Sequence, residues 1–484
     1  MIIFHIDVNS AFLSWSAVKR LEEDPESVDL RTIPSIVGGD QATRHGIVTA
    51  KSIPAKKYGI RTAEPVAQAM KKCPGLVVVK SDFKTYRRYS DAFMKILRKY
   101  TPVVEKASID EAYLDVTDLR EKYRYLETPQ DPFPVCLARR IRDEIRDTLG
   151  FTVNVGISTN KLLAKMASDF EKPDRIHTLY PEEIPEKMWP LPVRELYGCG
   201  ARTAARLEEM GMHTIGDAAR APEDYLQSVL GEKAGEYIWR SANGIGSVTV
   251  RMQREEVKSC SNEVTTPYDI TLSNYEKEML PLLKKLSEKV AGRLQKDGFY
   301  AGTVVVTVKT SEFVRRSIQA KLPDPTNRGE ILYAEAKRLA GQLLLGDRKD
   351  GKDGQEGLLH RTTGIRLVGV GTTDLDHGEY RQMSLADLLS VQPAAVQPAA
   401  VQPVSDSSTV SVSDHSAVSA DDRPAVPLPG QAEKNSVQDG GREQRKPEKR
   451  SVPRRSRAEK EEALTKMAQK IRNKYGNDAI RRGM

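Results

Sequence analysis

Hydrophobic positions in the first 170 residues alternate between two periods. Ile2 to Val8 is a short apolar run with β-branched residues, which predicts a buried strand. Residues 81–100 and 134–150 instead place apolar side chains every three or four positions, which predicts amphipathic helices. Two strands joined by a tight turn are predicted over 102–116, a strand over 151–158 and a helix over 160–170. This β-α-β-β-α-β order is typical of a ferredoxin-like layer, with two helices on one face of an antiparallel sheet.

The pattern changes along the rest of the chain. Residues 175–240 predict short helices punctuated by Gly and Pro, and residues 250–375 predict a separate α+β unit. A five-residue unit, VQPAA, then repeats from Val391 to Pro403, and Ser, Asp and Pro dominate as far as Gly441. Such a segment buries too little apolar surface to offset the entropy of ordering the chain, so we expect a disordered tether. The last segment regains helical periodicity.

Charge is unevenly spread over the 484 residues, whose net charge is +8. Residues 442–484 hold fifteen Lys or Arg against six Asp or Glu, whereas residues 381–441 hold three against seven. The remaining 380 residues carry a net charge of only +3. A basic balance therefore gives little support for nucleic-acid binding by the folded part, and local motifs must carry that argument.

Cysteine usage and hydropathy exclude several classes of protein. None of the four cysteines forms a C-x-x-C pair, which argues against a cysteine-zinc site or a dense disulfide framework and favours a reducing, cytoplasmic setting: Cys73, Cys136, Cys199 and Cys260. Because no run of about 18 apolar residues occurs, we expect no membrane span. The N-terminal residues lack a basic region, so they are interpreted as a strand and not as a signal peptide.

Three acidic residues stand where strands are predicted to end or turn. Asp7 follows the N-terminal apolar run, and Asp110 and Glu111 form an adjacent pair in the predicted hairpin SIDEAYLDV. In a ferredoxin-like sheet these strands lie side by side, so we expect the three carboxylates to converge. Hard divalent cations prefer carboxylate and carbonyl oxygens, and two cations about 3.5–4 Å apart need two or three shared carboxylates. The Val8 carbonyl is a further candidate ligand.

A structural role without catalysis also remains open for these acids. An acidic pair in a hairpin, considered alone, is more often a pair of solvated turn residues. Asp7 on a buried strand needs compensation for its charge, and either a cation or a Lys or Arg partner provides it. The enzymatic interpretation therefore requires that Asp7 lie beside Asp110 and Glu111. We also expect an ion pair that locks any of them to count against that interpretation.

Four segments, in order, resemble the motif set of the Y-family, or lesion-bypass, DNA polymerases: FHIDVNSAF, YRRYS, SIDEAYLD and VGISTNKLLAKMASDFEKPD. The most similar group is DNA polymerase IV, and the resemblance covers about residues 1–375. It implies an α+β multidomain right-hand polymerase, with a ferredoxin-like palm, small fingers, a helical thumb with a helix-hairpin-helix and an α+β little finger. The implied bounds are 1–10 and 75–170 for the palm, 11–74 for the fingers, 171–245 for the thumb, 250–375 for the little finger, 376–441 for a clamp-binding peptide with a disordered linker, and 442–484 for a basic helical tail.

The resemblance also implies an activity. Template-directed synthesis would join a primer 3′-OH to the α-phosphate of a deoxynucleotide, release pyrophosphate and proceed with low fidelity on damaged DNA. Asp7, Asp110, Glu111 and the Val8 carbonyl would hold two Mg²⁺ ions, with Asp110 and Glu111 as the catalytic pair. The family often has a second Asp two residues after the first, where this chain has Asn9, which we interpret as tolerated.

Residues of the nucleotide pocket are implied in the same way. Phe12 matches the family's steric gate, in which a ring packed on the deoxyribose leaves no room for a 2′-hydroxyl; its bland interpretation is a core residue. Lys161 resembles a palm lysine that contacts phosphates, and Lys165 lies one helical turn further on. For these lysines the alternative is a solvated face.

The segment GIVTAKSIPAKKYGI resembles the family's fingers motif over the triphosphate, with one departure. The family usually offers an aromatic residue followed three positions later by Arg, whereas this chain has Ile53 and Lys56. Lys keeps a point charge but loses the bidentate fork of Arg. Lys51 and Ser52 are candidates to compensate.

DNA contacts are expected in two later segments. LYGCGARTAARLEEMG resembles a helix-hairpin-helix in which Gly198, Gly200 and Arg202 meet a DNA phosphate; a plain Gly-rich turn is the alternative. In the 250–375 unit, phosphate contacts are expected from Lys309, Arg315 and Arg316.

A short peptide, RQMSLADLL, follows the last predicted strand. Gln382, Met383 and Leu385 resemble the bacterial sliding-clamp-binding peptide, although its usual aromatic residue is absent. A basic helix on a tether would raise the local concentration of DNA.

We therefore expect a monomeric bacterial polymerase that associates with the nucleoid when it acts and binds primer-template DNA and deoxynucleoside triphosphates. Two other functions compete with this interpretation. One is another two-metal palm enzyme, such as a nucleotide cyclase, which would not need residues 190–375. The other is a non-catalytic DNA-binding scaffold or polymerase accessory subunit, which would not need Asp7, Asp110 and Glu111 intact.

Overall fold

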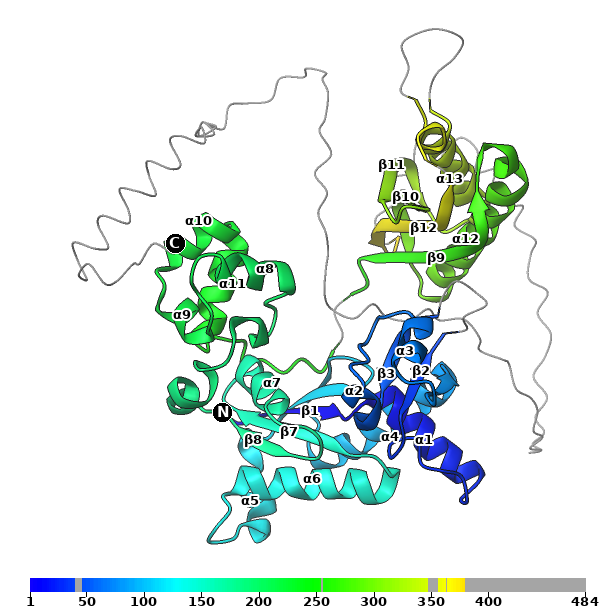
Figure 1. Ribbon diagram of the computed structural model, residues 1–484. Coiled ribbons are helices and arrows are strands. Elements are labelled where there is room, and N and C mark those ends of the chain that lie inside the picture. Colours follow the sequence, from blue (N-terminus) through cyan, green and yellow to red (C-terminus); the bar gives the residue numbers. More distant parts are fainter. Residues whose placement is uncertain (40–45, 254–255, 347–355, 363, 379–484) are drawn as a thin grey trace, which may run out of the picture. The chain divides into compact units, whose positions relative to one another are not determined.

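The computed structural model describes residues 1–39, 46–253, 256–346, 356–362 and 364–378 (Figure 1). The predicted tether, the clamp-binding peptide and the basic tail lie outside these residues. Among the helices in the described ranges, none is both long enough and apolar enough to span a bilayer.

A five-stranded sheet forms the N-terminal core, in the order β5-β6-β1-β7-β8. Its antiparallel strands β5, β6, β1 and β7 have the order and pairing of a ferredoxin-like sheet, as predicted, and β8 adds in parallel to β7. The strands are β1 (Ile3–Val8), β5 (Val104–Lys106), β6 (Glu111–Asp115), β7 (Val153–Ser158) and β8 (Ile176–Thr178). The helices are α4 (Phe83–Tyr100), α5 (Arg120–Tyr123), α6 (Phe133–Leu149) and α7 (Lys161–Asp169).

The central strands β1 and β7 are buried on both faces. Alternate side chains of β1, namely Phe4, Ile6 and Val8, join the hydrophobic core that includes residues of α4 and α6. The other side chains of β1 face α7, since Ile3 packs with Ala164 and His5 hydrogen-bonds to Ser168. Asp7 belongs to this second set, so its carboxylate lies on the α7 side of the sheet.

Helix α7 packs directly on β7 at Gly156. A Cβ atom added to Gly156 would lie 1.9 Å from the Ala164 carbonyl oxygen and 2.5 Å from the Ser168 nitrogen. No side chain fits at that position, because Cβ atoms do not approach other heavy atoms so closely. Helix α7 begins at an N-cap, where the Asn160 side chain accepts a hydrogen bond from the Leu163 nitrogen.

A three-stranded sheet, ordered β3-β2-β4, shares one small core with two helices and joins the core of the five-stranded sheet together with a third helix. Its strands are β2 (Ser35–Gly38), β3 (Val48–Lys51) and β4 (Val77–Lys80), and the nearby helices are α1 (Ala11–Glu23), α2 (Ile53–Lys57) and α3 (Val66–Lys72). Two strands cross the bounds expected from sequence. Strand β4 starts the segment expected to be palm but pairs with β2, and β8 lies in the segment expected to be thumb but pairs with β7.

Four helices follow: α8 (Ala201–Glu208), α9 (Ile215–Arg220), α10 (Glu223–Leu230) and α11 (Glu232–Ala242). Their apolar side chains share a core with residues of α7, which includes Leu163, Met166, Leu207, Ile215 and Ile238. Common capping residues mark the ends of these helices: Thr214 is the N-cap of α9, and Gly231 lies between α10 and α11.

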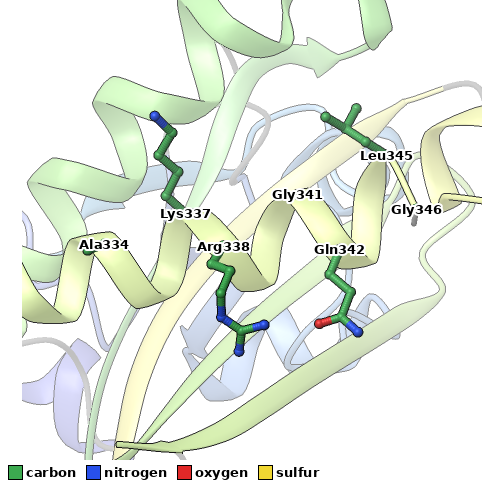
Figure 2. A pocket seen from close by; sticks show the side chains of 7 residues that line it. All are labelled: Ala334, Lys337, Arg338, Gly341, Gln342, Leu345 and Gly346. Atoms are coloured by element: carbon green, nitrogen blue, oxygen red, sulfur yellow. The ribbon is translucent and has the colours of Figure 1, made fainter. Parts of the chain in front are cut away.

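A four-stranded antiparallel sheet, ordered β11-β10-β12-β9, forms the last described unit. Its strands are β9 (Ser259–Ile270), β10 (Tyr300–Thr310), β11 (Arg315–Thr326) and β12 (Ile365–Asp376), and α12 (Tyr275–Lys296) and α13 (Gly329–Leu344) cover one face. An open hollow of about 560 Å³ lies along α13, and Figure 2 shows the residues that line it. It is lined by Ala334, Lys337, Arg338, Gly341, Gln342, Leu345 and Gly346.

Candidate active site

The five-stranded sheet brings the three predicted acidic residues to one place. Asp7 on β1 lies directly opposite Glu111 on β6, so the two side chains share a face of the sheet. The Val8 nitrogen donates a hydrogen bond to the Asp110 carbonyl oxygen over 3.0 Å. The Asp110 side chain is oriented by Ser108, whose hydroxyl donates to Oδ1 over 2.6 Å. The requirement that Asp7 lie beside the Asp110–Glu111 turn is met.

Two lysines that follow in the chain pair with these acids. Lys172 contacts the Asp7 carboxylate, and the Lys165 Nζ lies 2.8 Å from Glu111 Oε1. Asp169 joins the two lysines, at 3.1 Å from Lys165 and 2.9 Å from Lys172. The result is an alternating chain of charges that begins at Asp7 and ends at Glu111.

Burial and charge act against each other at these groups. Burial raises the pKa of Asp7 above its ordinary value, although Lys172 and Lys165 oppose that shift. Burial also raises the pKa of Asp110. For Lys165 burial by itself would lower the pKa, but the charges of Asp7, Glu111 and Asp169 outweigh it and raise the pKa. The carboxylates thus lie where a negative charge needs a positive neighbour.

The donor set suits a hard divalent cation, because it consists of carboxylate oxygens at adjacent strand ends. Within the described ranges no three His, Cys, Asp or Glu side chains are already grouped as metal ligands. Two of the three predicted acidic ligands, Asp7 and Glu111, are paired with lysines instead. The Lys172 side chain is 36% exposed, so it is not confined to its contact with Asp7, and a metal ion could replace it there.

Lys161 does not join this cluster. Its Nζ lies 2.6 Å from Glu105 Oε1 on β5 and 4.8 Å from the centre of the Tyr113 ring. Glu105 also accepts a hydrogen bond from the Arg251 nitrogen, so the pair ties the segment after α11 to the sheet. The cation beside Asp7 is Lys172, which sequence reasoning missed because it lies beyond the end of α7. The need of a buried Asp7 for a partner was the available signal.

Phe12 lies in the first turn of α1, within a cluster of aromatic rings. It stacks on Tyr86 with ring centres 4.6 Å apart and an angle of 14°, and it meets the Phe83 ring edge-on at 5.9 Å. The Tyr86 hydroxyl is in turn hydrogen-bonded to Ser16 at 3.0 Å. Phe12 is only partly buried, so one part of a firmly supported ring remains accessible.

A basic hollow of about 350 Å³ lies around the end of β3 and α2, and it is lined by Lys51, Lys56, Gly59, Ile60, Arg61 and Thr62. Lys51 donates to the Thr62 hydroxyl at 3.0 Å, and burial together with nearby Lys56 lowers the pKa of Lys51. Three cations therefore surround a space large enough for a phosphate group. Sequence reasoning did not single out Arg61.

Ser52 differs from the lysines beside it. Its hydroxyl donates to the Ile33 carbonyl at 2.8 Å and accepts from the Ala55 and Ser35 nitrogens. The side chain is buried and caps α2. These contacts occupy the hydroxyl and give the expected nucleotide-binding role no support.

The two glycines of the GCG segment have different surroundings. Gly198 has φ +82°, and a Cβ atom there would lie 2.4 Å from the Tyr237 hydroxyl oxygen, so only Gly fits. Gly200 is the N-cap of α8, and a Cβ atom added to it would meet nothing within 4 Å, which leaves its outer side open. Arg202 follows in the first turn of α8 and is exposed.

The basic residues of the four-stranded sheet lie near the β10–β11 turn. Lys309 on β10 is directly opposite Arg315 on β11. Arg315 pairs with Glu263 of β9, and Arg316 is exposed. Gln382, Met383 and Leu385 lie outside the described residues.

Matches to known proteins agree with this arrangement. The model of the impB/mucB/samB family matches residues 6–169, that of its C-terminal domain residues 257–385, and that of a DNA polymerase-iota thumb domain residues 194–246. A DNA polymerase IV of Clostridium acetobutylicum is 41% identical over 80% of this chain and 90% of its own length. DNA polymerase IV 1 of Bacillus subtilis is 35% identical over 79% of this chain and 85% of its own length.

Solved structures point the same way. A Y-family DNA polymerase chimera of Dbh and Dpo4 superposes with a TM-score of 0.63 at 25% identity, covering 77% of this chain and 99% of that one. The fold and site therefore define a right-hand polymerase with a ferredoxin-like palm. The chain belongs to the Y-family of DNA polymerases, in the DNA polymerase IV group.

This membership decides between the competing functions. It implies dependence on a divalent metal and binding of primer-template DNA and deoxynucleoside triphosphates. The matches to thumb and C-terminal domain models exclude a nucleotide cyclase. The expectation that an ion pair on Asp7 or Glu111 would count against a polymerase was wrong, because both acids are paired in a chain that belongs to the family.

Proposed function

We propose that this protein is a template-directed translesion DNA polymerase in which Asp7, the Val8 carbonyl, Asp110 and Glu111 hold two Mg²⁺ ions. The observation that carries the proposal is the register of β1 and β6, which sets Asp7 opposite Glu111 and beside Asp110. When bound, the ions would activate the primer 3′-OH and neutralise charge on the phosphates. Asp110 and Glu111 would be the catalytic pair.

Lys172 and Lys165 would act as exchangeable counter-ions of this site. In the described contacts they neutralise Asp7 and Glu111, and Asp169 offers each lysine a second carboxylate. On nucleotide binding, Lys172 would turn to the triphosphate and keep its contact with Asp169. Lys161 is a weaker candidate for phosphate contact, since Glu105 holds it.

The nucleotide would be selected by Phe12 and held by the basic hollow. The supported ring of Phe12 would reject a 2′-hydroxyl by occupying its place. Lys51, Lys56 and Arg61 would neutralise phosphate oxygens, which offsets the loss of the family's aromatic residue and Arg at Ile53 and Lys56.

DNA would be bound through its backbone. Gly198 and Gly200 would bring the N-terminus of α8 and Arg202 against a phosphate. Lys309, Arg315 and Arg316 would contact phosphates from the four-stranded sheet, without reading bases. Sequence specificity then comes from the template.

Other parts of the proposal concern organisation and partners. We assign the palm to 1–10 and 75–170, the fingers to 11–74, the thumb to 171–245 and the little finger to 250–375, with β4 and β8 pairing across those bounds. Residues 376–441 would hold the linker and a clamp-binding peptide at Gln382, Met383 and Leu385, and 442–484 a basic tail. The enzyme would act as a monomer on nucleoid DNA in the bacterial cytoplasm.

Primer extension with Mg²⁺ and deoxynucleotides tests the central claim. The wild-type chain should extend a primer on template, and it should also extend past a damaged template base. Lack of extension by properly folded wild-type protein would reject the proposed activity.

Deletion of residues 382–389 should reduce extension only when clamp is present, and an equal loss without clamp would reject the clamp assignment.

A further inference from the structure

The loop between α7 and β8 carries Lys172, and two buried asparagines hold its backbone. Asn154 of β7 is fully buried, and Asn9, just beyond β1, is 8% exposed. Both lie on the α7 side of the sheet, as Asp7 does. They contact each other, with Asn9 Nδ2 donating to Asn154 Oδ1 over 3.0 Å.

The Asn154 amide satisfies all four of its hydrogen-bonding positions with the end of α7, with the loop and with Asn9. Its Nδ2 donates to the carbonyls of Ser168 at 3.0 Å and Glu171 at 2.6 Å, and its Oδ1 accepts from the Arg175 nitrogen at 3.3 Å as well as from Asn9. Two carbonyl oxygens on one side and a backbone N–H on the other fix the orientation of the amide. A carboxylate at this position would face two carbonyl oxygens without a proton to donate.

Asn9 completes the arrangement from the other strand. Its Oδ1 accepts from the Asp174 nitrogen at 3.0 Å and from the Thr152 hydroxyl at 2.9 Å. Asp174 has φ +59°, in the left-handed region that Asp adopts more readily than most non-glycine residues. Asn9 therefore holds the backbone of the loop two residues after Lys172, through the Asp174 nitrogen.

We infer that Asn9 and Asn154 form a positioning pair that sets the place of Lys172 and thereby the affinity for nucleoside triphosphate. The pair holds loop backbone on both sides of Lys172, at Glu171 and at Asp174 and Arg175. The inference rests on the proposed function, because it takes Lys172 to meet the triphosphate. It also explains an Asn at position 9, where an Asp would oppose the Asn154 oxygen.

Single-nucleotide insertion kinetics on the full chain test the pair. Asn9→Asp should raise KM for deoxynucleotide about five- to tenfold and leave kcat within about twofold, since a lost positioning contact weakens binding more than chemistry. Thr152→Val, which removes one hydrogen bond to Asn9, should raise KM by a smaller factor. Binding of deoxynucleotide to the complex with a 3′-deoxy primer should weaken in the same order.

The decisive comparison uses Lys172→Ala as background. If Asn9 acts through Lys172, the double variant Asn9→Asp/Lys172→Ala should have the KM of Lys172→Ala alone. Asn243→Asp is the matched control, because it removes two amide donors to the Ala219 and Trp239 carbonyls in the helical part. Its KM should stay at the wild-type value.

Each outcome decides between the claims. A further rise in KM in the Lys172→Ala background, or a fall in kcat with unchanged KM, would overturn the positioning role. An unchanged KM in Lys172→Ala itself would remove the basis of the inference while primer extension by wild type still supports a polymerase. If Asn9→Asp unfolds below the assay temperature, Thr152→Val and its double variant with Lys172→Ala decide the question.

Discussion

Two ion pairs, one at each of the two large sheets, differ in how exposed their basic side chains are. Beside the five-stranded sheet, the Lys165 and Glu111 side chains are 10% and 26% exposed, whereas Arg315 and Glu263 on the four-stranded sheet are 54% and 29% exposed. Removing one partner of the first pair leaves a poorly hydrated charge, which is costly. Removing one partner of the second leaves a charge that water and salt can compensate.

The packing of the sheets explains this difference. Strands β1 and β7 are covered on both faces, by the core with α4 and α6 on one side and by α7 on the other. Strands β9 and β11 have α12 and α13 on one face only, and many of their side chains are exposed. Buried charges suit the chemical step at fixed geometry, while exposed charges suit a DNA backbone that must be bound and released as synthesis proceeds.

The largest effect is expected from removing a partly buried acid of the candidate active site. Asp110→Ala should lower kcat/KM for primer extension by about 10³-fold or more, because a lost metal ligand removes several kcal/mol of charge stabilisation. Asp118→Ala, at an exposed acid after the same hairpin, is the control and should extend at the wild-type rate. Extension by Asp110→Ala near the wild-type rate would reject the metal assignment.

An uncharged residue in the first turn of α1 should have the next largest effect. Phe12→Ala should raise insertion of ribonucleotide relative to deoxynucleotide by roughly 10- to 100-fold, the range that loss of steric rejection spans. Tyr86→Phe keeps the ring stacked on Phe12 and loses only the hydroxyl bonded to Ser16, so its sugar selectivity should not change. Unaltered selectivity in Phe12→Ala would dismiss the gate.

The exposed sheet should respond far more weakly. Arg316→Ala should reduce DNA affinity only a few-fold, equally for different sequences, and should lower the slope of log K against log salt by about one. Fluorescence anisotropy with labelled primer-template at several salt concentrations measures both quantities. Arg338→Ala, on α13 beside the hollow in Figure 2, is the control. An unchanged salt slope in Arg316→Ala would contradict the proposed contact.

The smallest effect is expected from the pair of Lys19 and Asp82. The exposure of these two side chains, 36% each, lies between that of Lys165 and that of Arg315. Asp82 caps α4 by accepting from the Thr85 nitrogen and pairs with Lys19 at 2.8 Å. The hydrogen bond from Lys19 lowers the pKa of Asp82, so its stabilisation is present above the unfolded-state pKa and is lost as pH falls toward the folded-state value.

Asp82→Asn keeps the cap and removes the charge. It should lower the free energy of unfolding by about 0.5 kcal/mol at pH 7. Because the unfolded-state pKa of Asp is about 3.9, the difference from wild type should shrink below about pH 4. Urea unfolding at neutral and acidic pH measures both values. An equal difference at the two pH values would show that charge is not the cause.

The spacing of hydrophobic residues and the order of the predicted elements were enough to predict most of the fold. They did not predict how the short strands pair. The helices over 83–100 and 133–149 and the ferredoxin-like strand order follow from the hydrophobic pattern. Strands β4 and β8 crossed the expected bounds because a four-residue or three-residue strand carries little pattern of its own, and the available sheet edge decides where it pairs.

The candidate site was predictable in its acids and much less in its cations. Asp7 was conspicuous because a carboxylate on a buried strand demands a partner, and β1 and β6 pair as expected. Lysines give no such signal, since their long side chains reach in several directions. Lys161 therefore looked suitable but pairs with Glu105, while Lys172 reaches Asp7 from a loop whose course depends on Asn9 and Asn154.

The contact between α7 and β7 at Gly156 has a consequence for how this enzyme can change. With no methyl group between them, helix and strand are already at their closest approach, and even alanine at Gly156 would push the helix outward. Lys165, in the middle of that helix, would move away from Glu111, and Asp169 would shift with it. The distance between Lys165 and the acids is thus set by Gly156, a residue without a charge or a side chain. Substitutions that adjust the nucleotide pocket therefore have to occur elsewhere in the chain.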